Sequence, residues 1–218
     1  MPAKRKRTPG TGAQTEQRLL EAVEWLMRKE GLARITTRQI ARAAGLAEGT
    51  LYNHFREKRE IFLAVLKRNV AEFAHVVQDL PLRVGQATVL DNLRPVAQAA
   101  IGFHTKAAPL ICSLLADQKL LAETRRAMED LRIGPHRSSQ ALAAYIAAEQ
   151  RLGRVNSDVA PEVAAGLILG TSFHMAVLEH FSGRPVEKKE RAARMRDAVE
   201  AIVLGLAPRT VSREKKRP

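Results

Sequence analysis

The sequence lacks most features that mark disulfide-bonded or membrane-spanning proteins. It contains one cysteine, Cys112, within the apolar run PLICSLLA. A single thiol excludes an intramolecular disulfide framework and is typical of a reducing cytoplasm, where a buried cysteine behaves as a small hydrophobic residue. The longest run without Asp, Glu, Lys or Arg, residues 163–178, is too short to span a bilayer. No apolar stretch follows the basic first residues, so no signal peptide is expected.

The motifs that carry most enzyme chemistry are also missing. The sequence has no HExxH pair, no Cys/His spacing for zinc, no GxxxxGK phosphate loop and no GxSxG nucleophile elbow. Glu72 and His75 form one Glu-x-x-His pair, whereas di-iron helical bundles need two such pairs. We therefore expect no enzyme activity and no metal or cofactor site.

Basic residues are in excess and gather at the two ends of the chain. The net charge is +13 and the isoelectric point is about 10.6, which favours a polyanionic partner. The first ten and the last ten residues each carry +4, which leaves +5 for the 198 residues between them. Residues 1–12 and 209–218 have too few apolar side chains to fold and are predicted to be disordered basic arms. Each arm either contacts a nucleic-acid backbone or is a solubilising tail.

Between these arms the hydrophobic pattern is helical nearly throughout, without strand alternation or repeats. We therefore expect an all-α fold. Pro95 predicts a kink or a late start in its helix, and Pro109 and Pro161 are expected to open new helices. The expected helices are 19–31, from about 58 to before Pro81, from about 89, 109–121, 123–132, 136–152, 161–181 and 187–206.

Residues 36–58, TTRQIARAAGLAEGTLYNHFREK, are the most informative segment. Thr36 and Gln39 form a capping-box pattern, so a helix should start at Thr37, and Gly45 should end it. Leu51 and Phe55 mark the inward face of a second helix. Two helices joined by such a turn form a helix-turn-helix whose polar face fits the major groove, although an ordinary helical hairpin remains an alternative. The outward residues of the second helix are Glu48, Gly49, Tyr52, Asn53 and Arg56.

The same residues carry a resemblance to a known family. A leading helix over residues 19–31, then TT..IA..AG and GTLY.HF..K, resembles the DNA-binding end of the TetR/AcrR family of bacterial transcription regulators. The resemblance covers about residues 13–66, and beyond them it is architectural only. It implies a three-helix DNA-binding domain at residues 13–58 and a helical effector-binding and dimerisation domain at residues 59–208.

The resemblance also implies roles for individual residues. It assigns phosphate contacts to Thr37, Thr50, Tyr52, His54 and Lys58, and base reading to Arg38, Glu48, Gly49 and Asn53. The chemistry agrees, because hydroxyls and a lysine ammonium suit phosphate oxygens. Arg38 can bind guanine, Asn53 can bind adenine, and Glu48 can accept from cytosine. Alternatively, Glu48 is a carboxylate favoured at a helix N-terminus by the macrodipole.

The last two predicted helices suit a dimer interface. One is apolar almost all round and the other is amphipathic, which is typical of a four-helix interface formed with a twofold mate. The alternative is that both helices complete the core of the monomer. The predicted interface residues are Leu167, Val177, Met195, Val199, Ile202 and Leu206.

Several bulky or polar-tipped side chains interrupt otherwise aliphatic helices of the second domain. Taken singly, each fits a core position better than a ligand contact, but together they predict the lining of an apolar effector pocket. These residues are Phe103, His104, Tyr145, Phe173, His174 and Met175.

The sequence therefore predicts a cytoplasmic, nucleoid-associated, homodimeric transcriptional regulator that binds double-stranded DNA specifically. Its simplest mode of action is repression at an inverted-repeat operator, relieved by a small apolar effector. The alternative is a nucleoid-type or small-molecule-binding helical protein without a specific operator. An enzyme built on a helical bundle is a third possibility that the missing motifs disfavour.

Overall fold

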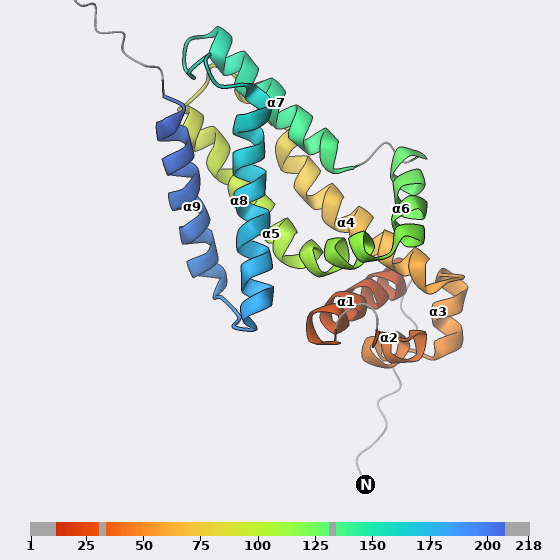
Figure 1. The fold of residues 1–218 in the computed structure, drawn as a ribbon. Coiled ribbons are helices and arrows are strands. Elements are labelled where there is room, and N and C mark those ends of the chain that lie inside the picture. Colours follow the sequence, from red (N-terminus) through yellow and green to blue (C-terminus); the bar gives the residue numbers. More distant parts are fainter. Residues whose placement is uncertain (1–11, 31–33, 131–133, 208–218) are drawn as a thin grey trace, which may run out of the picture. The chain divides into compact units, whose positions relative to one another are not determined.

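The computed structural model describes residues 12–30, 34–130 and 134–207, and over these ranges the chain is helical and contains no strand (Figure 1). The basic residues of both predicted arms lie outside the described residues. The elements are α1 (Gly12–Glu30), α2 (Thr37–Ala44), α3 (Glu48–His54), α4 (Lys58–Gln78), the 3-10 helix η2 (Leu80–Arg83), α5 (Val89–Ala116), α6 (Gln118–Asp130), α7 (Pro135–Arg151), α8 (Pro161–Ser182) and α9 (Lys188–Gly205).

The described residues form two compact units. The first contains the chain up to Arg68 together with Pro109–Arg125, and the second contains Asn69–Ala108 and the residues from Arg126 onward. Helices α1, α2 and α3 therefore belong to the first unit, and α7, α8 and α9 belong to the second. Helices α4, α5 and α6 contribute residues to both.

Three short apolar faces form the core of the helix-turn-helix in the first unit. Its buried residues include Leu19, Val23 and Leu26 of α1, Ile40, Ala41 and Ala44 of α2, Leu51 of α3, and Phe55. Helix α1 begins at Gly12, seven residues before the predicted start at Leu19. The buried stripe continues back through Thr15, a polar residue that an apolar pattern does not reveal.

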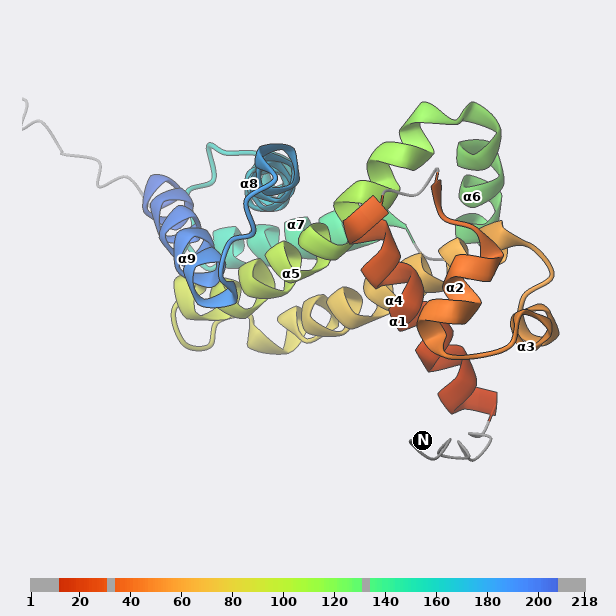
Figure 2. The ribbon, with the colours of Figure 1, turned by 90° about the horizontal axis from the view of Figure 1, so that it is seen from below.

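The second unit is built around packed helices α7, α8 and α9. Helix α8 packs against α7 on one side and α9 on another, and Figure 2 looks nearly along the axis of α8 with α9 beside it. Small residues Ala164 and Ala165 let the neighbouring helices approach α8 closely. On length and composition alone, α5 and α8 are apolar enough to cross a membrane. Ala100 of α5 and Ile168 of α8 belong to the shared core.

The structure corrects the prediction made for Pro109. Helix α5 starts at Val89 and continues through both Pro95 and Pro109 to Ala116, so no new helix begins at Pro109. Proline lacks the N–H that would bond the carbonyl four residues earlier, which is Thr105 at this site. His180 of α8 supplies the missing donor, with its Nε2 2.8 Å from the Thr105 carbonyl oxygen. The chain instead breaks at Asp117, and α6 runs unbroken from Gln118 to Asp130 where two helices were predicted.

Candidate nucleic-acid interface

Hydrogen bonds at both ends of α2 fix the turn between α2 and α3. The predicted capping box is present: the Gln39 N–H donates to Thr36 Oγ1 at 3.2 Å, and the Thr36 N–H donates to Gln39 Oε1 at 2.8 Å. At the other end, Gly45 has φ +65°, a left-handed conformation that glycine adopts at low cost. Arg18 of α1 donates to the Ala44 carbonyl at 2.6 Å, so a positively charged side chain binds a carbonyl group at the C-terminal end of α2. The role of Arg18 could not be predicted from the sequence, because no local pattern links it to a turn 26 residues away.

The face of α3 that points away from the core is polar and exposed. Leu51 is the buried residue of this helix, whereas Gly49, Tyr52 and Asn53 are exposed, Tyr52 at 49%. A Cβ added at Gly49 would meet no atom within 4 Å, so packing inside the chain does not require glycine there. A helix with one anchored face and one exposed polar face can enter a groove of DNA.

Glu48, the first residue of α3, binds two side chains of α2. Thr37 Oγ1 donates to Glu48 Oε1 at 3.0 Å, and Arg38 Nε lies 3.5 Å from Glu48 Oε2. Thr37 gives its only hydroxyl proton to the carboxylate. The 3.2 Å contact between Thr37 Oγ1 and the Tyr52 hydroxyl is therefore donated by Tyr52. Four predicted DNA-contacting residues thus form one polar chain that ties α3 to α2.

This arrangement gives the Glu48 carboxylate a role in the free protein. The N-cap residue of α3, Ala47, makes no side-chain hydrogen bond, so the negative charge of Glu48 compensates the positive end of the helix. Its partner Arg38 keeps a side chain that is 87% exposed. The guanidinium therefore remains accessible to a base or a phosphate even while it is paired.

The other predicted phosphate contacts are less exposed. Thr50 and His54 are half-buried on α3. Lys58, at the start of α4, is also half-buried, and its Nζ lies 5.4 Å from the centroid of the Phe62 ring. This partial burial lowers the pKa of the Lys58 ammonium.

Three of the six predicted effector-pocket residues meet in the second unit. Phe103 stacks on Phe73 with ring centroids 5.5 Å apart, and His104 lies 5.5 Å from Phe173 in an edge-on contact. Ser172 Oγ donates to the Leu169 carbonyl, so its 2.7 Å contact with His104 Nδ1 is donated by the imidazole. Burial lowers the pKa of His104 to about 4, which makes this imidazole neutral at pH 7.

The other three predicted pocket residues have different environments. Tyr145 is buried, its hydroxyl accepts from Asn92 Nδ2 at 3.0 Å, and burial raises its pKa. Met175 is half-buried, and His174 is exposed on the outer face of α8. The contacts of the described residues thus join Phe103 and Phe173 through His104, and whether the six residues bind an effector together stays a prediction.

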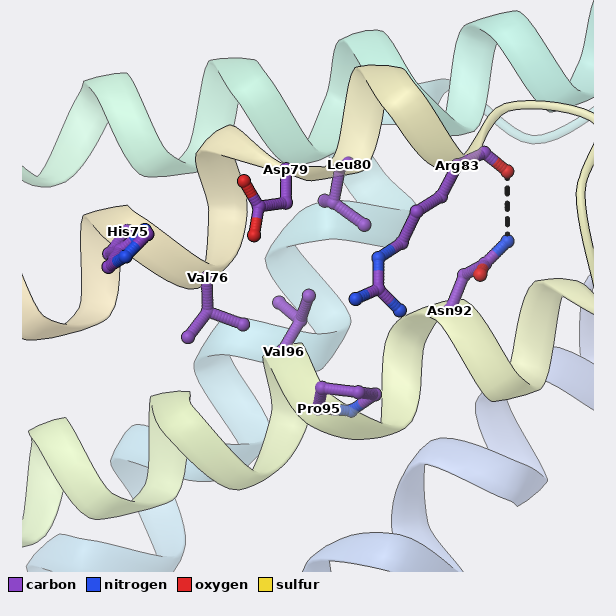
Figure 3. A pocket seen from close by; sticks show the side chains of 8 residues that line it. All are labelled: His75, Val76, Asp79, Leu80, Arg83, Asn92, Pro95 and Val96. Atoms are coloured by element: carbon purple, nitrogen blue, oxygen red, sulfur yellow. Dashed lines mark hydrogen bonds between the residues drawn. The ribbon is translucent and has the colours of Figure 1, made fainter.

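A surface cleft of about 260 Å³ opens in the second unit near the end of α4, η2 and the start of α5 (Figure 3). Arg83 extends into it, and the Asn92 amide donates to the Arg83 carbonyl at 3.1 Å. None of the six predicted pocket residues lines this cleft, and sequence reasoning did not point to it. Its lining residues are His75, Val76, Asp79, Leu80, Arg83, Asn92, Pro95 and Val96.

The predicted dimer-interface residues divide into two groups. Met195, Val199 and Leu206 are buried in the core of their own chain and are not available to a second copy. Val177 and Ile202 are half-buried, and Leu167 is 49% exposed. Three further apolar residues of α8, which were not predicted, share the exposed face of Leu167, and the pairs 163/167 and 178/181 have the helical spacings of four and three residues. These are Val163, Leu178 and Phe181, exposed at 55%, 52% and 91%.

Comparison with known proteins identifies the segment that contains α2 and α3. The family model for bacterial regulatory proteins of the tetR family matches residues 19–65. The chain belongs to the TetR family. As a TetR-family member it is a DNA-binding transcriptional regulator and not an enzyme. The DNA contacts assigned to its nine individual residues remain predictions.

Relatives of this TetR-family chain differ in how much of it they match. The nucleoid occlusion factor SlmA of Marinobacter nauticus is 27% identical over 161 residues, which are 74% of this chain and 78% of that protein. The HTH-type transcriptional regulator TtgR of Pseudomonas putida is 38% identical over 61 residues, only 28% of this chain and 29% of TtgR. The transcriptional regulator FadR of Bacillus subtilis, solved in complex with stearoyl-CoA, is 16% identical over 87% of this chain and 98% of that chain, with a TM-score of 0.63. At that identity, the likeness to FadR shows the fold.

Proposed function

We propose that this regulator is a homodimer that represses transcription from an inverted-repeat operator until a small apolar effector releases it. The observation that carries the proposal is the pair α2 and α3, whose exposed residues Arg38, Tyr52 and Asn53 lie within the segment matched by the family model. An arginine and an asparagine on such a face are suited to guanine and adenine, respectively. A tyrosine hydroxyl is suited to a phosphate oxygen, which fixes the register of the protein on the duplex.

The exposed face of α8 supports a dimer. Val163, Leu167, Leu178 and Phe181 share one face of α8, and each is at least 49% exposed in the described chain. Gly166 and Gly170 lie on the same face, and a Cβ added to either would meet no atom within 4 Å. An apolar stripe with small residues allows a second helix to approach closely, and a twofold axis would pair the same stripe from each copy. Two recognition helices would then face two half-sites of an inverted repeat.

The aromatic cluster of the second unit supports an effector site. Phe103, His104 and Phe173 come from α5 and α8, and the neutral imidazole adds a polar group to an otherwise apolar cluster. Apolar walls with a few polar groups are typical of small-molecule sites. FadR, which shares this fold, was solved in complex with stearoyl-CoA, so that protein binds a ligand that carries a long acyl chain.

One observation favours a second candidate function. The relative that matches 74% of this chain is a nucleoid occlusion factor, not a protein named for regulating transcription. A nucleoid-type protein that binds DNA without a regulated promoter is therefore the alternative.

Selection of binding sites from random duplexes tests the proposal. The full-length protein should enrich an inverted repeat and prefer it over bulk DNA by a factor of about a thousand or more at physiological salt. Reporter transcription from a promoter that carries the selected site should then fall when the protein is expressed. Failure to enrich any sequence, with equal affinity for all duplexes, would favour the nucleoid-type alternative.

A further inference from the structure

The cleft shown in Figure 3 lies entirely within the second unit and has an apolar wall. Val76 of α4 and Pro95 of α5 are half-buried members of this wall, and Leu80 and Val96 add two buried side chains to it. With about 30 Å³ for each water, the cleft volume of about 260 Å³ corresponds to roughly nine water molecules. This size suits a small metabolite with an aliphatic part.

Two side chains of opposite charge, Asp79 and Arg83, share the cleft without pairing. Arg83 extends into the cleft between η2 and α5, whereas the Asp79 carboxylate lies nearer Val76 (Figure 3). Among the residues that the structure describes, no hydrogen bond or ion pair engages the side chain of Asp79 or of Arg83. Both charges therefore remain available to a ligand.

The local backbone explains why these two charges do not pair. Residues four apart lie on one face of an α-helix and can form an ion pair there. The segment Leu80–Arg83 that follows Asp79 is instead a 3-10 helix. With about three residues per turn and a rise of about 2 Å, residues four apart are separated by about 8 Å along the axis and by about a third of a turn.

Unpaired charges of opposite sign select a ligand that carries both signs. A simple anion would bind Arg83 but would be repelled by Asp79, and a simple cation would meet the reverse. A zwitterion places each of its groups against the opposite charge and forms two charge-assisted hydrogen bonds. An α-amino acid carries both groups on one carbon atom, which leaves its side chain for the apolar wall.

We propose that this cleft binds a free aliphatic α-amino acid, with its carboxylate on the Arg83 guanidinium, its ammonium on the Asp79 carboxylate and its side chain on the apolar wall. His75 of α4 also lines the cleft, and its imidazole can donate to the carboxylate or accept from the ammonium. The cleft shares no residue with the aromatic cluster proposed above as the effector site. Binding there requires neither an operator nor repression.

Leucine and two analogues test the charge requirement on the full-length protein without DNA. Isocaproate has the same branched chain without the ammonium, and isoamylamine has it without the carboxylate. Leucine should bind at least about tenfold more tightly than either, as expected when one charge-assisted hydrogen bond is lost. An NMR titration measures the affinities and should shift the side-chain amide signal of Asn92, which lines the cleft. Leucine that shifts no signal at about 10 mM, or that binds no more tightly than the better analogue, overturns the site.

Two variants that each remove one charge test the assigned contacts separately. Asp79→Asn should bind leucine and isocaproate with similar affinity, because the ammonium has lost its partner. Arg83→Gln should likewise bind leucine and isoamylamine with similar affinity. The matched controls Asp158→Asn and Arg184→Gln, at exposed positions of the second unit outside the cleft, should keep the wild-type preference. A preference for leucine that survives both Asp79→Asn and Arg83→Gln would overturn the proposal.

Discussion

Tyr52 and Asn53 are neighbours on α3, yet their chemistry predicts different effects on DNA binding. Tyr52→Phe removes the hydroxyl that donates to Thr37 and that suits a phosphate, so binding to all sequences should weaken by a similar factor. Asn53→Ala should relax the preference at one base pair, at a cost of about 1–3 kcal/mol there. Binding-site selection with both variants measures the two patterns. If Tyr52→Phe altered the selected sequence and Asn53→Ala did not, the two roles would have to be exchanged.

His104 should make the stability of the protein depend on pH. Its pKa in the folded protein is lowered from 6.5 to about 4, because burial disfavours the imidazolium. Between these values the unfolded chain binds a proton that the folded protein does not. The contribution of the neutral His104 to the free energy of unfolding is therefore fully present above pH 6.5 and is lost as the pH falls toward 4. Chemical denaturation at pH 7 and pH 4.5 should show a loss of up to about 3 kcal/mol from this group. A His104→Gln variant with the same loss would contradict the prediction.

At the scale of elements, α8 should decide the oligomeric state. Leu167→Asp with Leu178→Asp places charges on its exposed apolar stripe and should yield folded monomers that lose operator binding. Leu82→Asp is the matched control, because Leu82 is 74% exposed on η2. Sedimentation equilibrium distinguishes the outcomes, and a double variant that remains dimeric would place the interface elsewhere. Charges at Val199 would not test the interface, because that side chain is buried in its own chain and the change would unfold the second unit.

Elements with local determinants were predicted well from the sequence, and elements that depend on distant partners were not. The capping box of α2 and the left-handed Gly45 involve residues a few positions apart, so their pattern is visible in the sequence. The continuation of α5 through Pro109 depends on His180, which donates to a carbonyl 75 residues away. The packing of residues 109–125 with the first unit likewise follows from tertiary contacts such as that of Arg59 with Glu123.

The candidate site shows the same division. The polar face of α3 could be predicted because Leu51 and Phe55 fix which side is buried. The contacts of Glu48 with Thr37 and Arg38 could not, because they depend on the angle between two helices. On α9, the periodicity identified an apolar stripe at Met195 and Val199 correctly. Periodicity does not distinguish a stripe that packs inside the chain from one that meets a second copy.

At the scale of the whole molecule, the basic N-terminal arm should add to DNA affinity without adding specificity. Removal of residues 1–10 takes away four positive charges. Affinity should fall, and the log–log dependence of affinity on salt should flatten by up to about four units if all four charges meet phosphates. Fluorescence anisotropy at several salt concentrations measures both effects. An unchanged slope would show that the arm does not contact DNA.

Effector and operator should oppose each other's binding. Helix α4, like α5 and α6, contributes residues to both units, so it is one element through which a ligand in the second unit can affect the first. An effector that binds the DNA-incompetent form more tightly must itself be bound more weakly in the presence of operator, by the same factor. Phe173→Trp should block the effector and leave operator affinity nearly intact. Calorimetry with and without operator measures the coupling. Equal affinities for the effector in the two titrations would contradict this mechanism.

The way α3 is held has a consequence for engineering. Helix α3 has seven residues and no side-chain N-cap, so it is too short to be stable in isolation. It therefore cannot be transplanted alone into another scaffold, and a graft must carry α2 and the Arg18 contact with it. The exposed positions Gly49, Tyr52 and Asn53 bury little, so their identities can be exchanged in a library at small cost in folding free energy. New operator preferences should then be selectable on this chain without compensating changes in its core.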